Sequence, residues 1–277
     1  MPLSMTIVFA ILLGLIVGSF LTVLIVRYPA MLESQWRRDC QSYLHAPLDP
    51  PEKINLWIPR SRCPHCETPL KLCHNIPLFS FCFLRGRCAY CQKRISALYP
   101  AVEFLTAILT VFMLLRFEMS TQLFPVLIFT WTLIALFFID LRHHLLPDTL
   151  TLIPLWLGLL LSIFHLFVSP KAAIIGAILG YGVLWVTAYL FKLVRKKEGM
   201  GHGDFKMLAM IGTWFGPMMV LNSLLLAVIL ALLTSILLLV SKRIRFETAI
   251  PFGSFLAVGG WISLLSHEAL VKWLIPM

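Results

Sequence analysis

The feature that most constrains this sequence is a series of long apolar runs, each close to the ~20 residues that a helix needs to cross the hydrocarbon core of a bilayer. Of the 277 residues, 59% are hydrophobic and only 13% are charged, whereas soluble domains have about 25% charged residues. The sequence therefore predicts an all-α polytopic membrane protein with about eight transmembrane helices. The runs are approximately 3–26, 98–115, 122–141, 149–168, 172–193, 205–221, 222–240 and 252–270.

Two features of these runs bear on the topology. The sixth and seventh runs meet around 217–222 and are compatible with one broken helix or with two short ones. The first run lacks a basic start and is long enough to remain as a membrane span, so we expect no cleavable signal peptide.

The charges predict how the chain is oriented. The polar stretch 27–97 holds eleven Lys and Arg residues against five acidic ones, and cytoplasmic loops carry such an excess. This places 27–97 in the cytoplasm, and eight spans then put both termini outside. The net charge of +10 is explained by this rule, so we expect a lipid bilayer and no nucleic acid as partner.

All seven cysteines lie in the predicted cytoplasmic stretch, where disulfides are rare. Four of them form two Cys-x-x-Cys pairs separated by 21 residues: Cys63, Cys66, Cys88 and Cys91. Two such pairs are typical of a closed tetrahedral zinc site, which stabilises a fold and leaves no open position for catalysis. The alternatives are four unliganded buried thiols, or His65 or His74 replacing one thiolate.

Two acidic residues stand at the ends of predicted spans. Asp140 ends the third span and Asp204 opens the sixth, and the topology places both at the cytoplasmic face. Two carboxylates at one depth can share a proton, so that one activates water and the other polarises a scissile carbonyl. We therefore predict an aspartic-protease pair. Taken singly, Asp140 is also compatible with an ordinary helix-end acid, and Asp204 with an N-cap.

The residues around this pair have simpler interpretations. Gly201 and Gly203 leave room for an extended substrate beside Asp204, so we predict that they bind substrate. Asp148 is expected to cap the fourth span rather than serve as a third catalytic acid. Lys206 either tunes the charge of Asp204 or extends to the lipid headgroups. Glu103 is expected to be an interfacial group or the partner of a nearby base.

Together these residues resemble a known family, the prepilin peptidases, or type IV leader peptidases, which are Gly-x-Gly-Asp membrane aspartic peptidases. The resemblance covers nearly the whole chain. It is carried by Gly18-Ser-Phe-Leu-Thr at the first span, Cys63-Pro-His-Cys66, Tyr99-Pro100-Ala-Val-Glu103, Ile139-Asp140 and Gly201-His-Gly203-Asp204.

The resemblance implies a bifunctional enzyme of the bacterial inner membrane. Such enzymes cut the leader from type IV prepilins and pseudopilins after a glycine at the cytoplasmic face, and then methylate the new N-terminal residue from S-adenosylmethionine. It implies a first transmembrane helix at 1–26, a zinc-binding domain associated with methylation at 27–97, and a seven-helix peptidase domain at 98–277. The methyl-donor site is not implied.

Three other classes of function remain as alternatives. A proton-coupled transporter also uses membrane acids, but those lie near the midplane rather than at span ends. A non-enzymatic assembly protein would use the cysteine region for docking. A peptidase without methylation is the third, although this chain keeps the four cysteines that such relatives lack.

Overall fold

Apolar helices make up nearly all the regular structure of the computed structural model, which describes residues 3–47, 55–197, 199–243 and 248–274. Within these ranges there is no β-strand beyond two isolated bridges. The predicted all-α fold class is therefore confirmed. The chain divides into two compact units, Met1–Trp131 and Thr132–Met277, and each is described separately.

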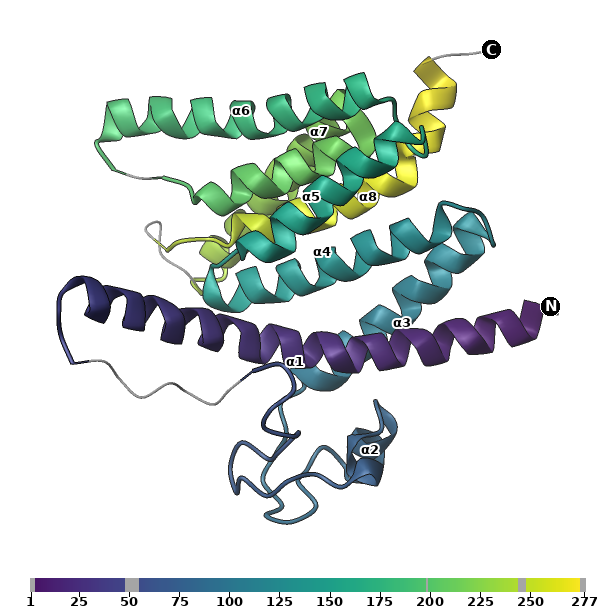
Figure 1. The fold of residues 1–277 in the computed structure, drawn as a ribbon, viewed down its shortest axis with the longest axis vertical. Coiled ribbons are helices and arrows are strands. Elements are labelled where there is room, and N and C mark those ends of the chain that lie inside the picture. Colours follow the sequence, from purple (N-terminus) through teal and green to yellow (C-terminus); the bar gives the residue numbers. More distant parts are fainter. Residues whose placement is uncertain (1–2, 48–54, 198, 244–247, 275–277) are drawn as a thin grey trace. The chain divides into compact units, whose positions relative to one another are not determined.

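The first unit is built on two long helices. Helix α1 (Leu3–Tyr43) lies beside α3 (Leu98–Phe117), and the connecting segment carries a 3₁₀ turn η1 (Leu72–Asn75) and the short helix α2 (Phe79–Phe83) (Figure 1). The unit ends within α4 (Leu123–His143).

Helix α1 runs 17 residues beyond the predicted span end at position 26, or about 26 Å at 1.5 Å per residue. The predicted division at 1–26, 27–97 and 98–277 stays a prediction, but its second part begins inside a helix.

Small residues bring α1 and α3 together. A Cβ added to Gly14 would lie 2.6 Å from the Cα of Ala107, and one added to Gly18 would lie 2.8 Å from the Cα of Glu103. Glycines four residues apart face the same side of a helix and let two membrane helices approach at backbone distance. The two glycines therefore fix the side of α1 that receives α3.

The second unit holds the end of α4 and four further helices. These are α5 (Asp148–Ile163), α6 (Pro170–Arg195), α7 (His202–Val240) and α8 (Phe252–Leu274). Helix α7 is the central element, because it packs against α5, α6 and α8.

Each of the eight predicted apolar runs lies in or overlaps a helix. The fourth ends early: α5 stops at Ile163 instead of 168, because the backbone turns through His165 with a φ of 54°.

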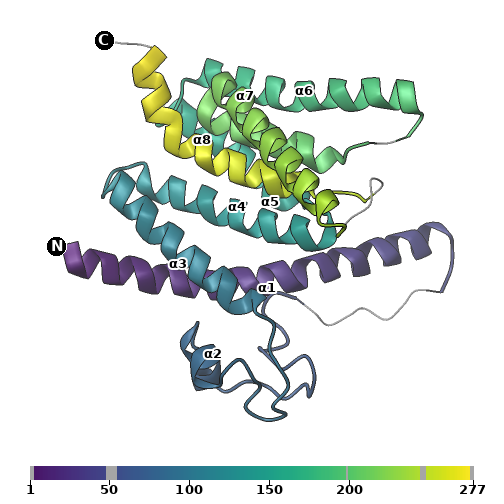
Figure 2. The same cartoon turned by 180° about the vertical axis from the view of Figure 1, so that it is seen from behind.

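The two runs that meet within α7 are resolved as one broken helix that folds back on itself. Gly216 has a φ of 77°, which only glycine adopts easily, and Pro217 has no N–H to continue the helix. Residues on both sides of this break meet α8 at the same level: Gly259 contacts Ser223, and Gly260 contacts Ile211. Figure 2 shows the two arms of α7 running antiparallel. The break at Gly216 and Pro217 therefore lies at the beginning of the region 217–222 in which the two runs were expected to meet.

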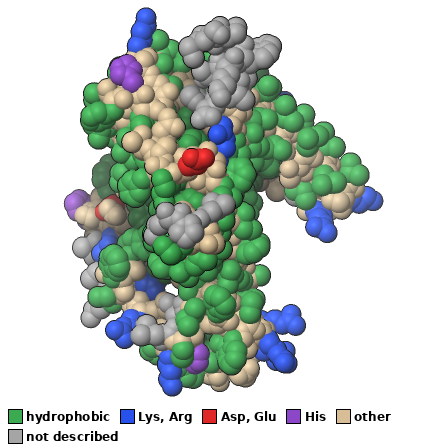
Figure 3. Space-filling model, turned by 90° about the vertical axis from the view of Figure 1, so that its right-hand side faces the viewer, with side chains coloured by type: hydrophobic (Ala, Val, Ile, Leu, Met, Phe, Trp, Pro, Cys, Tyr) green, Lys and Arg blue, Asp and Glu red, His purple; other side chains and the backbone are tan. Residues whose placement is uncertain are grey.

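The helices are suited to lipid. Five of them, α1, α3, α4, α6 and α7, are long and apolar enough to cross a membrane, and α5 and α8 are shorter apolar helices. Large apolar side chains face outward, for example Ile178 and Leu190 on α6 and Trp156 on α5. Figure 3 shows one face of the molecule covered mostly by hydrophobic side chains. In water such a surface would promote aggregation, whereas in a bilayer it lies against the lipid chains.

Candidate active site and metal centre

Asp140 is held by the beginning of α8. It lies in the last turn of α4, only 5% exposed, and its Oδ2 accepts two hydrogen bonds from Ser254, one from the backbone N–H at 2.6 Å and one from the hydroxyl at 2.9 Å. The same hydroxyl lies 3.1 Å from the carbonyl oxygen of Phe137. One carboxylate oxygen is thus fixed by a residue 114 positions away, which nothing in the local sequence around Asp140 indicates.

Asp204 lies in the first turn of α7 and is 8% exposed. Its Oδ1 is buried without a hydrogen-bond partner in the described structure. Gly201 is the N-cap of α7, and a Cβ placed there would lie 3.7 Å from Oδ2 of Asp204. The absence of a side chain at Gly201 therefore leaves one side of the carboxylate uncovered.

Leu146 links the surroundings of the two acids. Its side chain is 2.7 Å from the position of an added Cβ on Gly203 and equally close to that on Gly253, while the Gly253 position is 3.1 Å from Cγ of Asp140. The two carboxylates are near enough to interact electrostatically. The structure thus brings Asp140 and Asp204 into one buried site. Packing against Leu146 is by itself sufficient reason for glycine at Gly203, so its role in substrate binding stays a prediction.

The expected role of Asp148 is wrong, and Lys206 has a partner that was not expected. Helix α5 begins at Asp148 and its N-cap is Pro147, so Asp148 stands inside the first turn and does not cap the helix. An acid there is still favoured by the helix dipole. Lys206 pairs with Asp148 at 2.6 Å, an ion pair that neither of its two expected roles includes. Asp148 is therefore engaged in an ion pair at the margin of the site.

Glu103 also differs from expectation. It is buried in α3, and its Oε2 accepts the backbone N–H of Leu78 at 2.8 Å. The Ser19 hydroxyl lies near this carboxylate. Among the described residues, no ion pair joins Glu103 to a base. The carboxylate thus lies inside the first unit, surrounded by neutral donors.

The four cysteines of the two Cys-x-x-Cys pairs meet at one point. One atom of each, the Sγ, lies within 4.8 Å of all the others, and among the described residues this is the one group able to hold a metal ion. The other three cysteines, Cys40, Cys73 and Cys82, are exposed and stand outside it.

Two equivalent turns position the sulfurs. The backbone N–H of His65 donates to the Sγ of Cys63 at 3.4 Å, and that of Tyr90 donates to Cys88 at the same distance. Each turn closes through a left-handed residue directly after its second cysteine, Glu67 in one and Gln92 in the other. The two halves are thus related by a shift of 25 residues.

The sulfur geometry fits a tetrahedral metal ion. The Sγ atoms of Cys63 and Cys91 are 3.8 Å apart, and those of Cys66 and Cys88 are 4.0 Å apart. A tetrahedral ion with metal–sulfur bonds of about 2.3 Å holds its ligands about 3.8 Å apart, whereas a disulfide requires about 2.05 Å. Hydrogen bonds from Thr68 lower the pKa of the Cys66 thiol to about 6, which favours the thiolate that binds metal.

Comparison with known proteins gives consistent matches along the chain. A family model described as bacterial peptidase A24 N-terminal domain matches residues 12–117, and one described as type IV leader peptidase family matches residues 127–236. A protein from Stutzerimonas stutzeri is 45% identical over 258 residues, which cover 92% of this chain and 89% of the relative.

Other relatives give the same result. One from Aeromonas hydrophila is 45% identical over 265 residues, covering 95% of this chain and 91% of its own length. One from Pseudomonas aeruginosa is 42% identical over 263 residues, with the same coverage. All three are named prepilin leader peptidase/N-methyltransferase. No solved structure matches the chain significantly.

Proposed function

The chain belongs to the type IV leader peptidase family, and from this premise we propose that it is a prepilin leader peptidase and N-methyltransferase. It cleaves the leader of type IV prepilins or pseudopilins after a glycine, and it methylates the N-terminal residue that the cut exposes. The observation that carries the peptidase assignment is the burial of Asp140 and Asp204 in one site, at the end of one helix and the start of another.

The two carboxylates divide the work of hydrolysis. One of them takes a proton from water as the oxygen attacks the scissile carbonyl, and the other, protonated, polarises that carbonyl and later protonates the leaving amine. Ser254 holds Oδ2 of Asp140 with two hydrogen bonds, so it acts as a positioning residue. Gly201 keeps the approach to Asp204 free of side chains. An extended substrate passes there, with Gly203 as a second contact.

The position of the acids favours hydrolysis over proton transport. Both lie within four residues of a helix end, whereas acids that relay protons across a membrane occupy its midplane. We place this end at the cytoplasmic face of the inner membrane, because the Lys- and Arg-rich stretch 27–97 lies inside by the positive-inside rule. The eight apolar segments then leave both termini in the periplasm.

The cysteine site serves the second activity. We assign it a structural zinc ion, bound by Cys63, Cys66, Cys88 and Cys91, whose S–S distances support tetrahedral ligation. Zinc there closes two turns of a segment that has little apolar core of its own. S-adenosylmethionine supplies an electrophilic methyl group, and the N-terminal amine of the cleaved pilin accepts it. Residues 27–97 form the domain for this step, and 98–277 form the peptidase domain.

The test incubates the purified full-length protein with a prepilin and with S-adenosylmethionine carrying a labelled methyl group. Mass spectrometry should find a cut after the leader glycine and one labelled methyl group on the new N-terminal residue. Asp204→Asn should abolish cleavage, yet it should still methylate a pilin supplied without its leader. Cleavage of prepilin by Asp204→Asn at the wild-type rate would refute the assignment of the acids.

A further inference from the structure

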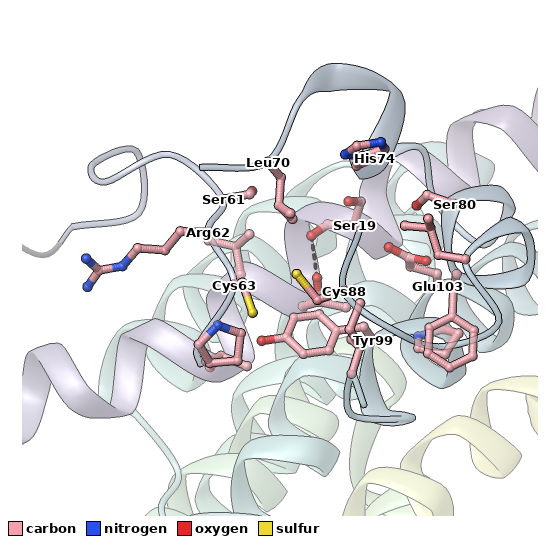
Figure 4. Close-up of a pocket in the computed structure, with 18 of the residues that line it drawn as sticks. Ser19, Ser61, Arg62, Cys63, Leu70, His74, Ser80, Cys88, Tyr99 and Glu103 are labelled. Atoms are coloured by element: carbon pink, nitrogen blue, oxygen red, sulfur yellow. Dashed lines mark hydrogen bonds between the residues drawn. The ribbon is translucent and has the colours of Figure 1, made fainter. Parts of the chain in front are cut away.

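The first unit contains a cavity of about 460 Å³ that the proposed peptidase site does not use. Its walls come from α1, from the cysteine-bearing segment and from the start of α3 (Figure 4). Cys63 and Cys88 of the metal centre line it, together with Tyr99 and Glu103 of α3. This volume lies in the range of ~300–1,000 Å³ that is usual for small-molecule sites.

The buried carboxylate of Glu103 defines one end of the cavity. It accepts the Leu78 N–H at 2.8 Å, and the Ser19 hydroxyl lies nearby; both groups are neutral. Within the described ranges, no lysine, arginine or histidine forms an ion pair with it. Because buried charges are normally paired, a carboxylate so placed is suited to a positively charged ligand.

The remaining lining suits an aromatic group and a negative charge. Apolar side chains form much of the wall, among them Val23, Val26, Leu70, Ile76 and Phe81. In the view of Figure 4, the Tyr99 ring lies between the cysteine sulfurs and Glu103, while the Arg62 guanidinium points away. Arg62 instead lies 3.6 Å from Glu67. Arg27 also lines the cavity, and its Nη1 donates to the backbone oxygen of Asn55 at 3.1 Å. An exposed hydrogen bond of this kind can be exchanged for one to a ligand carboxylate, so Arg27 is the base that we assign to it.

We propose that this cavity binds S-adenosylmethionine, with Glu103 beside the sulfonium, the apolar wall around the adenosyl group and Arg27 near the amino-acid carboxylate. The inference rests on the proposed N-methyltransferase function and names the site at which the methyl donor binds. Methyl transfer converts the sulfonium to a neutral thioether, so the carboxylate favours the donor over the spent product, S-adenosylhomocysteine.

The experiment measures binding of both compounds to the full-length protein in detergent, by isothermal titration calorimetry. Glu103→Gln keeps an acceptor for the Leu78 N–H but removes the charge. It should weaken binding of S-adenosylmethionine about tenfold or more and binding of S-adenosylhomocysteine less than about threefold. If binding of both compounds were weakened equally, or if binding of neither were weakened, the placement of Glu103 beside the sulfonium would be overturned.

A second variant tests the cavity itself. Ala30 lies at an exposed position of α1 and lines the cavity, so Ala30→Trp should fill it and abolish donor binding. Gln35→Trp is the matched control, because Gln35 is exposed on the same helix and does not line the cavity. It should bind the donor normally.

Prepilin cleavage reports folding of the unit that holds the acids, and retention of the metal at the four cysteines reports folding of the unit that holds the cavity. An Ala30→Trp protein that cleaves prepilin and binds S-adenosylmethionine with wild-type affinity would overturn the assignment of the cavity. It would leave the proposed methyltransferase function standing. A wild-type protein that cleaves prepilin but neither binds the donor nor transfers its methyl group would overturn the proposed methyltransferase function as well.

Discussion

Ser254→Ala isolates the contribution of one hydroxyl to the peptidase site. The backbone N–H of residue 254 still donates to Oδ2 of Asp140 at 2.6 Å, while the hydroxyl bond of 2.9 Å is lost. A hydrogen bond to a charged group contributes about 1.5–3 kcal/mol. The hydroxyl has a single proton and is also 3.1 Å from the Phe137 carbonyl oxygen. We therefore expect the lower limit, about 1.5 kcal/mol, or roughly a tenfold loss in kcat.

The assay is steady-state cleavage of a purified prepilin at a fixed detergent concentration. Ser254 contacts Asp140 and is not expected to contact substrate, so kcat should fall about tenfold while KM stays within about twofold. A change of this kind separates positioning of the acid from loss of substrate binding.

The control is Ser263→Ala, another buried serine of α8. Its hydroxyl lies 2.8 Å from that of Ser223 and 3.1 Å from Nδ2 of Asn222, and it contacts neither acid. This variant should lose stability but keep the wild-type kcat. An unchanged kcat in Ser254→Ala, or an equal loss in Ser263→Ala, would refute the positioning role.

Three further predictions concern the acids, the metal and the helix packing. Asp140→Asn and Asp204→Asn should each abolish cleavage, because an amide cannot accept a proton from water; single-turnover cleavage near the wild-type rate in either would contradict this. Elemental analysis should find about one zinc per chain, and Cys88→Ser should lose the metal and depress methylation more than saturated cleavage. An active, intact preparation without metal would count against the zinc assignment. Gly176→Ala should lower the Tm, since a Cβ there would overlap the Gly212 carbonyl oxygen, at an expected cost of about 1–3 kcal/mol. Gly182→Ala is its control, because an added Cβ meets nothing within 4 Å, and an equal drop in Tm would argue against the packing explanation.

The helices were predictable because hydropathy alone marks a segment that must cross lipid. The reversal within α7 was not fully predictable, because both arms are apolar and the pattern is the same for a straight or a folded helix. Gly216 and Pro217 are the local signal for it. The extension of α1 to Tyr43 was missed because the residues after position 26 are mostly polar and interrupt the apolar run. Polar residues exclude lipid but not a helix.

The candidate site was predictable in its acids and cysteines but not in its supporting contacts. Asp140 and the cysteine pairs stand out because a charge at a span end and paired thiols are rare without a function. Ser254 is one serine at the start of an apolar run, and its partner is 114 residues away. Likewise, the pairing of Lys206 with Asp148 depends on the packing of two helices. Such contacts come from tertiary structure, and no local pattern in a single sequence predicts them.

The hydrogen bonds from Ser254 to Asp140 also determine when the enzyme becomes competent during synthesis. Ser254 is the third residue of α8, which leaves the ribosome after the helices that carry the two aspartates. A nascent chain that ends before this helix already carries both aspartates, but Asp140 lacks both of its donors. The peptidase site is therefore completed only when α8 has been made and inserted. A protease that shares its membrane with newly made proteins thus lacks a positioned Asp140 until α8 is in place.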